Sequence, residues 1–255
     1  MSGPGAGNPK RPFGPPLRSA SAGTAHEDGR LNAPHPREAG PGRAGRPDGD
    51  RLPLPLRRTP QQRRSVERVE RILDAAVDLL VEEGYQAATT TRIAGRAGVG
   101  LATLYSFFAD RRAVYRAASV RNLDAFLDRL DRLLSGARFD HWWEAAAAGF
   151  DEYVRMSRAE PGFRALRFGD VADDRLLAGG RRNDEVVVER IVHLVVRHFG
   201  AEPDERMRTS LLVAVAAVDA LVRLAFELDP ERGDPAVLAE ARQVAQGILA
   251  RGAGA

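Results

Sequence analysis

The residues with the clearest potential for chemistry lie between positions 89 and 108, where small and hydroxyl-bearing side chains recur at helical spacing. A threonine run at the start of this stretch can cap a helix, and the apolar residues after it predict a short helix over about 91–97. Gly98 follows where the chain must turn sharply, because a residue without Cβ adopts positive φ at little steric cost. The pattern indicates two short helices joined at a glycine.

The second short helix is expected to divide its side chains between two faces. Leu101 and Leu104 are predicted to point back toward the turn, so Ala102, Thr103 and Ser106 must face outward. An outward face of this size and polarity fits the major groove of DNA, where a threonine can hydrogen-bond a base edge or place its methyl group near thymine.

An ordinary helical hairpin inside a core would show the same pair of helices, so the flanking sequence decides between the two interpretations. An amphipathic helix is expected ahead of the pair, over about 61–83. Behind it come two aromatic residues and Asp110, a favourable N-cap for a long helix from Arg111 to about Gly136. This long helix would couple the pair to whatever follows it.

Taken from Arg71 to Ala117, this order of elements closely resembles the DNA-binding domain of the TetR family of bacterial transcriptional regulators. In many family members a serine stands at the position of Gly100 and a lysine at the position of Arg111, and an arginine can still hold a phosphate through its forked donors. The motifs in the family's order and spacing are Ile72-Leu73-Asp74-Ala75-Ala76, Gly84-Tyr85, Thr91-Arg92-Ile93-Ala94, Ala97-Gly98-Val99 and Leu104-Tyr105-Ser106-Phe107-Phe108.

The resemblance implies an all-α fold with an N-terminal three-helix helix-turn-helix DNA-binding domain and a C-terminal helical ligand-binding and dimerisation domain. We expect a disordered extension over 1–60, the DNA-binding domain over 61–118 and the effector-binding domain over 119–251. Base contacts are expected from Ala102 and Thr103, and core packing is the alternative role for Tyr105. The full set of expected DNA contacts is Thr90, Thr91, Arg92, Leu101, Ala102, Thr103, Tyr105, Ser106 and Arg111.

The extension is rich in Gly, Pro, Ala and Arg and has almost no aliphatic periodicity, so it cannot bury enough apolar surface to fold alone. It is either a basic arm that adds DNA affinity or sequence ahead of the true start. Residues 1–71 hold 14 Lys and Arg against 7 Asp and Glu, a charge of +7, which leaves 24 against 28, or −4, for the remainder. The basic residues that lead into or lie on the first helix are Arg57, Arg58, Arg63, Arg64 and Arg68.

In the remainder of the chain, apolar residues recur at helical spacing, which predicts further helices. The last two of these helices look like a homodimer interface. Residues 211–218 are apolar on every face of a helix, which must therefore be covered all round. We expect pairing through about 204–228 and 235–250, as the resemblance also implies; closure of a core within one chain is the alternative. The other expected helices run from His141 to before Pro161, over 163–168, and over 183–199 with Asn183 as N-cap.

The family's C-terminal domain usually holds a small-molecule pocket whose occupancy changes the spacing of two DNA readers. Large side chains near the expected pocket helices favour an apolar effector, although side chains of these types more often pack in a core than line a ligand site. A protein partner that controls a dimer without a pocket is the alternative. The candidate ligand contacts are Trp142, Trp143, Phe150, Tyr153, Met156, Phe163 and Phe168.

Catalysis is disfavoured by the residues that are present. His193 and His198 are five apart, off the spacing that puts two ligands on one helical face, and the chain has no Gly-rich phosphate loop or Gly-x-Ser-x-Gly elbow. Cysteine is absent, which removes thiolate chemistry and fits a cytoplasmic protein. No metal, cofactor or membrane contact is expected; the expected partners are double-stranded DNA with a near-palindromic operator, a second copy of the chain and an effector.

Overall fold

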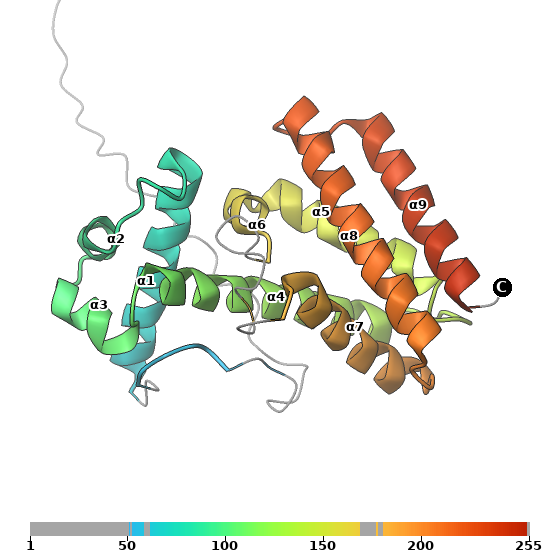
Figure 1. Ribbon diagram of the computed structural model, residues 1–255, viewed down its shortest axis with the longest axis horizontal. Helices are drawn as coiled ribbons and strands as arrows, with labels where there is room; N and C mark the ends of the chain where they lie inside the picture. The colour runs from blue at the N-terminus through green and yellow to red at the C-terminus, as the bar shows by residue number, and fades with distance from the viewer. Residues whose placement is uncertain (1–50, 52, 59–61, 169–176, 178–180, 254–255) are drawn as a thin grey trace, which may run out of the picture. The chain divides into compact units, whose positions relative to one another are not determined.

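The structure is a computed structural model that describes residues 51, 53–58, 62–168, 177 and 181–253, and its elements there are α-helices, as predicted (Figure 1). None of these helices combines the length and apolar character that a membrane span needs. The helices are α1 (Arg63–Glu83), α2 (Thr90–Ala97), α3 (Leu101–Phe107), α4 (Arg111–Gly136), α5 (Ala145–Ala159), α6 (Pro161–Leu166), α7 (Asn183–Phe199), α8 (Glu205–Leu228) and α9 (Pro235–Ala253).

The first three helices gather around one end of α4 and enclose a core of their own, the N-terminal core (Figure 1). Local signals define the turns between them. Thr89 accepts a hydrogen bond from the backbone N–H of Arg92, and Gly98 takes a left-handed conformation with φ of 62°. Asp110 caps α4 by accepting from the N–H of Ala113 at 2.7 Å. The fully buried side chains of this core include Ile72, Leu73, Ile93, Leu104, Phe108 and Tyr115.

Helix α4 connects this core to the rest of the chain. At 26 residues it is about 39 Å long, so its first turns join the N-terminal core while its later turns join the C-terminal core, formed with α5 to α9. Arg121 of α4 donates to both Glu70 and Asp74 of α1 at 2.9 Å, which ties the two helices together by charge.

Helix α6 also connects the two cores. Leu166 is fully buried in the N-terminal core, whereas Phe163, three residues earlier, is buried in the C-terminal core. Gly162 lies so close to α1 that a Cβ there would stand 2.3 Å from Cγ1 of Val77. The absence of a side chain at this position therefore lets α6 dock directly on α1.

Several predicted boundaries were wrong. Helix α5 begins at Ala145 rather than His141, and α6 begins earlier than expected because Pro161, which suits the first position of a helix, opens it. Asn183 is the first residue of α7 rather than its N-cap, since its side-chain oxygen accepts instead from the backbone N–H of Leu177 at 2.9 Å.

The expected extension also requires a correction at its end. Residues 1–50 lie outside the described residues, but part of the segment 53–58 is half-buried against the helices. Leu54 and Leu56 cover the N-terminal core, and Leu54 also touches the C-terminal one. Leucines that alternate with prolines show neither helical nor strand periodicity, so the sequence did not predict this packing.

Candidate nucleic-acid interface and apolar cavity

The surface of α3 presents small and polar side chains. Ala102 and Ser106 are exposed, Thr103 is half-buried, and Leu104 is fully buried beneath them. This is the predicted outward face. Leu101 was expected to point back toward the turn, and that expectation was wrong, because the residue is 39% exposed.

Tyr105 joins this surface to the start of α2. This residue is 39% exposed, which argues against core packing as its role. Its hydroxyl lies 3.1 Å from the hydroxyl of Thr90, and Thr91 beside it is also exposed. The structure therefore brings the hydroxyl groups of the two helices together on one exposed surface, where hydroxyls can donate to phosphate oxygens.

The two arginines predicted to hold phosphates are already engaged within the protein. Both terminal nitrogens of Arg92 donate to the carboxylate of Glu83, and these hydrogen bonds lower the pKa of Glu83 and raise that of Arg92. The guanidinium of Arg111 lies 4.2 Å above the ring of Tyr85 and donates to its carbonyl at 3.0 Å. A phosphate would have to compete with these internal partners for either side chain.

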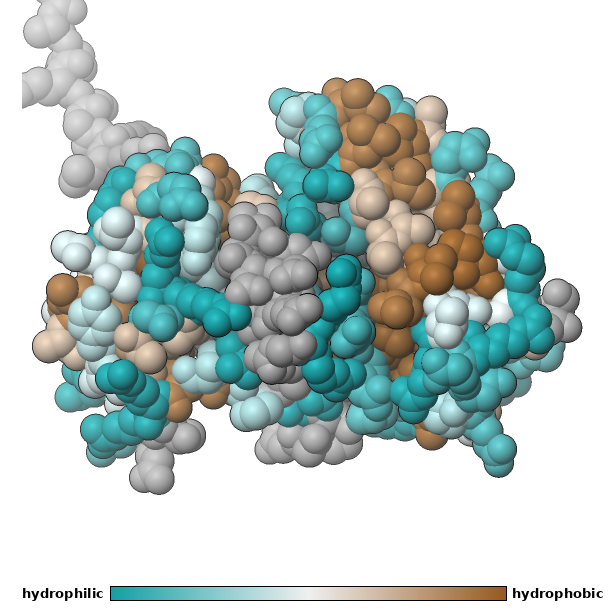
Figure 2. Space-filling model, viewed as in Figure 1, coloured by the Kyte–Doolittle hydropathy of each residue, from teal (hydrophilic) through white to brown (hydrophobic). Residues whose placement is uncertain are grey.

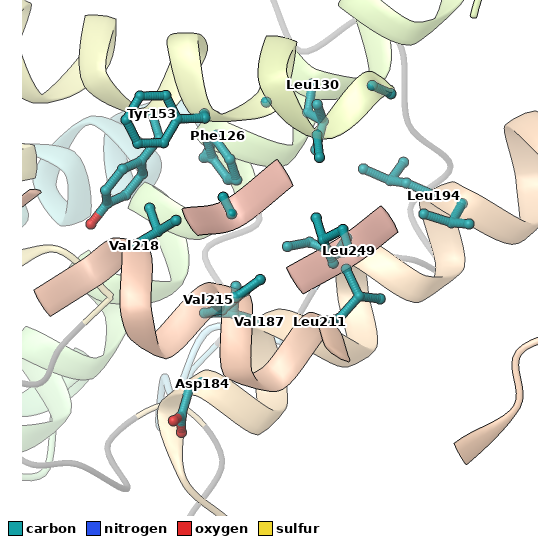
Figure 3. Close-up of a pocket in the computed structure, with 18 of the residues that line it drawn as sticks. Phe126, Leu130, Tyr153, Asp184, Val187, Leu194, Leu211, Val215, Val218 and Leu249 are labelled. Carbon is teal, nitrogen blue, oxygen red and sulfur yellow. The ribbon is translucent and has the colours of Figure 1, made fainter. Parts of the chain in front are cut away.

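A cavity of about 260 Å³ lies in the C-terminal part, lined by residues of α4, α5, α7, α8 and α9. Its wall is largely aliphatic and aromatic, with side chains from different helices converging on it (Figure 3). Asp184 lies apart from these side chains and pairs with Arg182 at 3.1 Å. Besides Asp184, the residues that Figure 3 labels are Phe126, Leu130, Tyr153, Val187, Leu194, Leu211, Val215, Val218 and Leu249.

Polar groups meet the cavity wall at Tyr153 and Asp219. The Tyr153 hydroxyl donates to a carboxylate oxygen of Asp219 at 3.0 Å, and the Nε of Arg167 lies 3.3 Å from the same oxygen. Nε of Arg167 is buried without a hydrogen-bond partner in the described residues. Arg167 also has φ of 48°, a conformation that a non-glycine residue adopts only when its surroundings impose it, here at the end of α6.

Of the seven side chains predicted to line a pocket, Trp142, Phe150, Tyr153 and Phe168 do so. The other three do not. Met156 and Phe163 are buried in the C-terminal core, and Trp143 stacks on His141 with ring centroids 4.2 Å apart. The remaining wall was missed because aliphatic residues such as Val187 and Leu211 carry no signal that separates a cavity wall from a core.

The last two helices pack side by side and leave an apolar face uncovered. Val213, Leu224 and Leu228 of α8 are 49%, 42% and 61% exposed, and Val244 of α9 is 38% exposed. Figure 2 shows a hydrophobic surface running over both helices. Large apolar side chains gathered in this way on one face are typical of a protein interface.

Comparison with known proteins places this geometry among bacterial regulators. Residues 72–118 match the profile of "Bacterial regulatory proteins, tetR family", and residues 140–253 match "Tetracyclin repressor-like, C-terminal domain". A solved TetR-family transcriptional regulator from Streptomyces coelicolor is 36% identical, with 72% of this chain and 98% of that chain covered and a TM-score of 0.63.

Two curated relatives come from mycobacteria. The transcriptional regulator AlkX of Mycobacterium tuberculosis is 30% identical over 41% of this chain, and the match spans only 49% of that protein's length. The transcriptional activator FasR of Mycolicibacterium smegmatis is 28% identical, covering 59% of this chain and 69% of that protein. Both are named as helix-turn-helix regulators.

Proposed function

The chain belongs to the TetR family of DNA-binding transcriptional regulators, a non-enzymatic family, and we propose that it is a homodimeric repressor released from a near-palindromic operator by a small apolar effector. The largely apolar cavity between these helices is the observation that carries the effector part of this proposal. A dimer bound over a promoter would exclude polymerase, which makes repression the simplest outcome of binding. In this proposal, residues 61–118 form the DNA-binding domain and residues 119–251 form the effector-binding domain.

The DNA-reading part rests on the surface of α3. Ala102 and Thr103 would contact bases, whereas Tyr105, Thr90 and Thr91 would hold phosphates and fix the register of the helix. Two such helices in a dimer would bind half-sites one turn of DNA apart, roughly 34 to 36 Å, and so require an inverted repeat. Leu101, Ser106, Arg92 and Arg111 complete the proposed contact set, with the two arginines exchanging their internal partners for phosphates.

The dimer part rests on the uncovered apolar face of α8 and α9. Val213 and Leu224 would cost free energy if left in water, at about 25 cal/mol per Å² of apolar surface. A second copy offering the same face would cover them by two-fold symmetry, which is the commonest arrangement for soluble oligomers.

The effector that suits this cavity is mainly apolar and carries one uncharged hydrogen-bonding group. Asp219 is paired with Arg167 and Asp184 with Arg182, so the described residues of the wall offer no excess charge to a charged ligand. The contact between Tyr153 and Asp219 is the place where a hydroxyl, amide or ester could exchange hydrogen bonds.

Helix α6 supplies a route from the cavity to the reader. The ring of Phe163 lies against the rings of Tyr153 and Phe168, both in the cavity wall, with centroids 5.6 and 5.7 Å apart. Three residues further, Leu166 is buried in the N-terminal core. An effector that binds one position of α6 better than another would therefore shift the equilibrium between two positions of the reader.

Genome-wide capture of DNA by the purified protein tests the reader. A short inverted repeat should be enriched by the wild type and lost by the double variant Thr103→Ala/Tyr105→Ala. Enrichment that survives both changes would mean that α3 is not the reading helix. A promoter–reporter fusion carrying the repeat then separates repression from activation.

The effector is tested with uncharged aliphatic and aromatic compounds, each with and without one hydroxyl group. Compounds that fit should raise the melting temperature and release the captured repeat, and Tyr153→Phe should weaken only the hydroxylated ones. If no compound has either effect, control by a protein partner becomes the better explanation, and pull-down on operator DNA would detect that partner.

A further inference from the structure

Residues 51 and 53–58 form a strap that runs along the helices before α1 begins, in the blue part of the ribbon below α4 (Figure 1). Its middle is held by apolar contacts, since Leu54 packs on both cores and Leu56 on the N-terminal one. The strap is therefore a fixed part of the fold over its described residues.

The strap is anchored by charge at one end. Arg51 donates two hydrogen bonds to the carboxylate of Asp128, at 3.0 and 2.8 Å, and lies 4.0 Å from Asp124. Both partners belong to α4, and the Asp128 side chain is only 12% exposed. A two-pronged guanidinium–carboxylate contact in partly buried surroundings holds its geometry better than an exposed ion pair.

The other end of the strap is bonded to the recognition helix itself. The backbone N–H of Arg57 donates to the carbonyl of Phe107, the last residue of α3, at 2.9 Å. This bond places Arg57 and its neighbour Arg58 directly beside the C-terminal end of α3. Both side chains are exposed.

Arg57 and Arg58 differ from the arginines of the helix-turn-helix in the hydrogen bonds and ion pairs of their side chains. Within the part of the chain that the structure describes, neither Arg57 nor Arg58 has a side-chain hydrogen bond or ion pair, whereas Arg92 and Arg111 are both engaged. A cation without an internal partner can bind a phosphate without first giving up another contact. The available positive charge near α3 therefore includes the strap.

We propose that Arg57 and Arg58 form a second DNA-contact site, which binds backbone phosphates beside the groove segment that α3 reads. The proposal rests on the proposed DNA-binding function and adds to it the element that supplies affinity. The backbone bond to Phe107 makes the two contacts move as one unit, so the strap would set the register of α3 on the duplex without itself reading sequence.

Each phosphate neutralised adds about 0.9 to the slope of log affinity against log salt concentration. Loss of both arginines would then reduce the slope by about 1.8 per protomer and about 3.6 for a dimer on a full operator. Between 50 and 200 mM salt, the wild type would lose about 150-fold more affinity than the variant.

The test is fluorescence anisotropy with the full chain, using one duplex that contains the captured inverted repeat and one of mixed sequence. Arg57→Ala/Arg58→Ala should flatten the salt dependence on both duplexes and leave the ratio of their affinities nearly unchanged. Arg57→Lys/Arg58→Lys should retain most of the slope, because the charge is kept.

The matched control is Arg132→Ala/Arg138→Ala, which also removes two exposed arginines. Arg132 lies about 32 Å along α4 from Arg111, and Arg138 follows the end of that helix. The control should keep the wild-type slope. Equal slopes for the wild type and the strap variant would overturn the proposal, whereas a wild type that binds neither duplex would instead overturn the proposed DNA-binding function.

Discussion

A methyl group added at position 162 tests whether α6 transmits the state of the cavity to the DNA reader. The substitution is Gly162→Ala, on the side of α6 that touches α1. The new Cβ would stand 2.3 Å from Cγ1 of Val77, whereas ordinary carbon contacts begin near 3.4 Å. The two helices must therefore separate by about 1 Å or more, because valine is stiff at χ1 and cannot turn aside freely.

Overpacking of this kind costs typically about 1 to 3 kcal/mol of folding free energy. For a chain of this size, each kcal/mol lowers the melting temperature by about 2 to 4 °C, so a fall of about 2 to 12 °C is expected. The clash also moves α6 relative to the reader, so operator affinity and the concentration of effector needed for release should change with it. Gly136→Ala, at the end of α4, is the control, since its added Cβ would meet no atom within 4 Å and the residue does not line the cavity.

A double-mutant cycle with Val77→Ala identifies the cause. Val77→Ala removes the methyl group that Gly162→Ala would strike, so the double variant should be more stable than the sum of the two single losses by about 1 kcal/mol or more. Urea unfolding measures the free energies, and anisotropy on the captured operator measures the coupling. Additive losses, or a Gly162→Ala protein with wild-type affinity and effector response, would refute the role given to α6.

Three further outcomes are expected. Leu224→Arg places a charge in the uncovered face of α8 and should convert a dimer to a monomer in sedimentation velocity, while Val81→Arg, at an equally exposed valine of α1, should not. Glu83→Gln releases Arg92 and should steepen the salt dependence of DNA binding; an unchanged slope would show that Arg92 does not reach DNA. Burial raises the pKa of Tyr115 to about 12, so the unfolded chain loses this proton from about pH 10 while the folded one keeps it. Stability should therefore fall between pH 10 and 12, and Tyr115→Phe should lessen that fall in urea unfolding measured at each pH.

The features that the sequence predicted well depend on local chemistry. Thr89, Gly98 and Asp110 mark helix ends because a cap or a left-handed turn needs particular residue types within three or four positions. The outward face of α3 followed from helical spacing alone. Each of these signals depends only on residues close in the sequence, so the sequence alone predicts the structure there.

The features that the sequence did not predict depend on tertiary packing. Asn183 has the residue type of a cap, yet its side chain bonds to Leu177, whose position depends on the folded chain. The cavity is walled by aliphatic residues such as Val187, which look like any others that face a core. The packing of Leu54 depends on two cores made of residues far from it in the sequence, so no local pattern predicts it.

The distribution of charge around α3 would separate affinity from specificity in the proposed complex with DNA. The face that would read bases is small and nearly uncharged, and Arg92 beside it is neutralised by Glu83. Uncommitted exposed arginines lie instead on the strap and on α1, where Arg64 and Arg68 have no ion pair among the described residues. Because α6 docks on α1 as well, a change in the cavity that moved α6 would shift the phosphate contacts together with the reader. Release from DNA would then require no change in the shape of α3 itself, only a displacement of the reader and its phosphate contacts, as one unit, from the half-site.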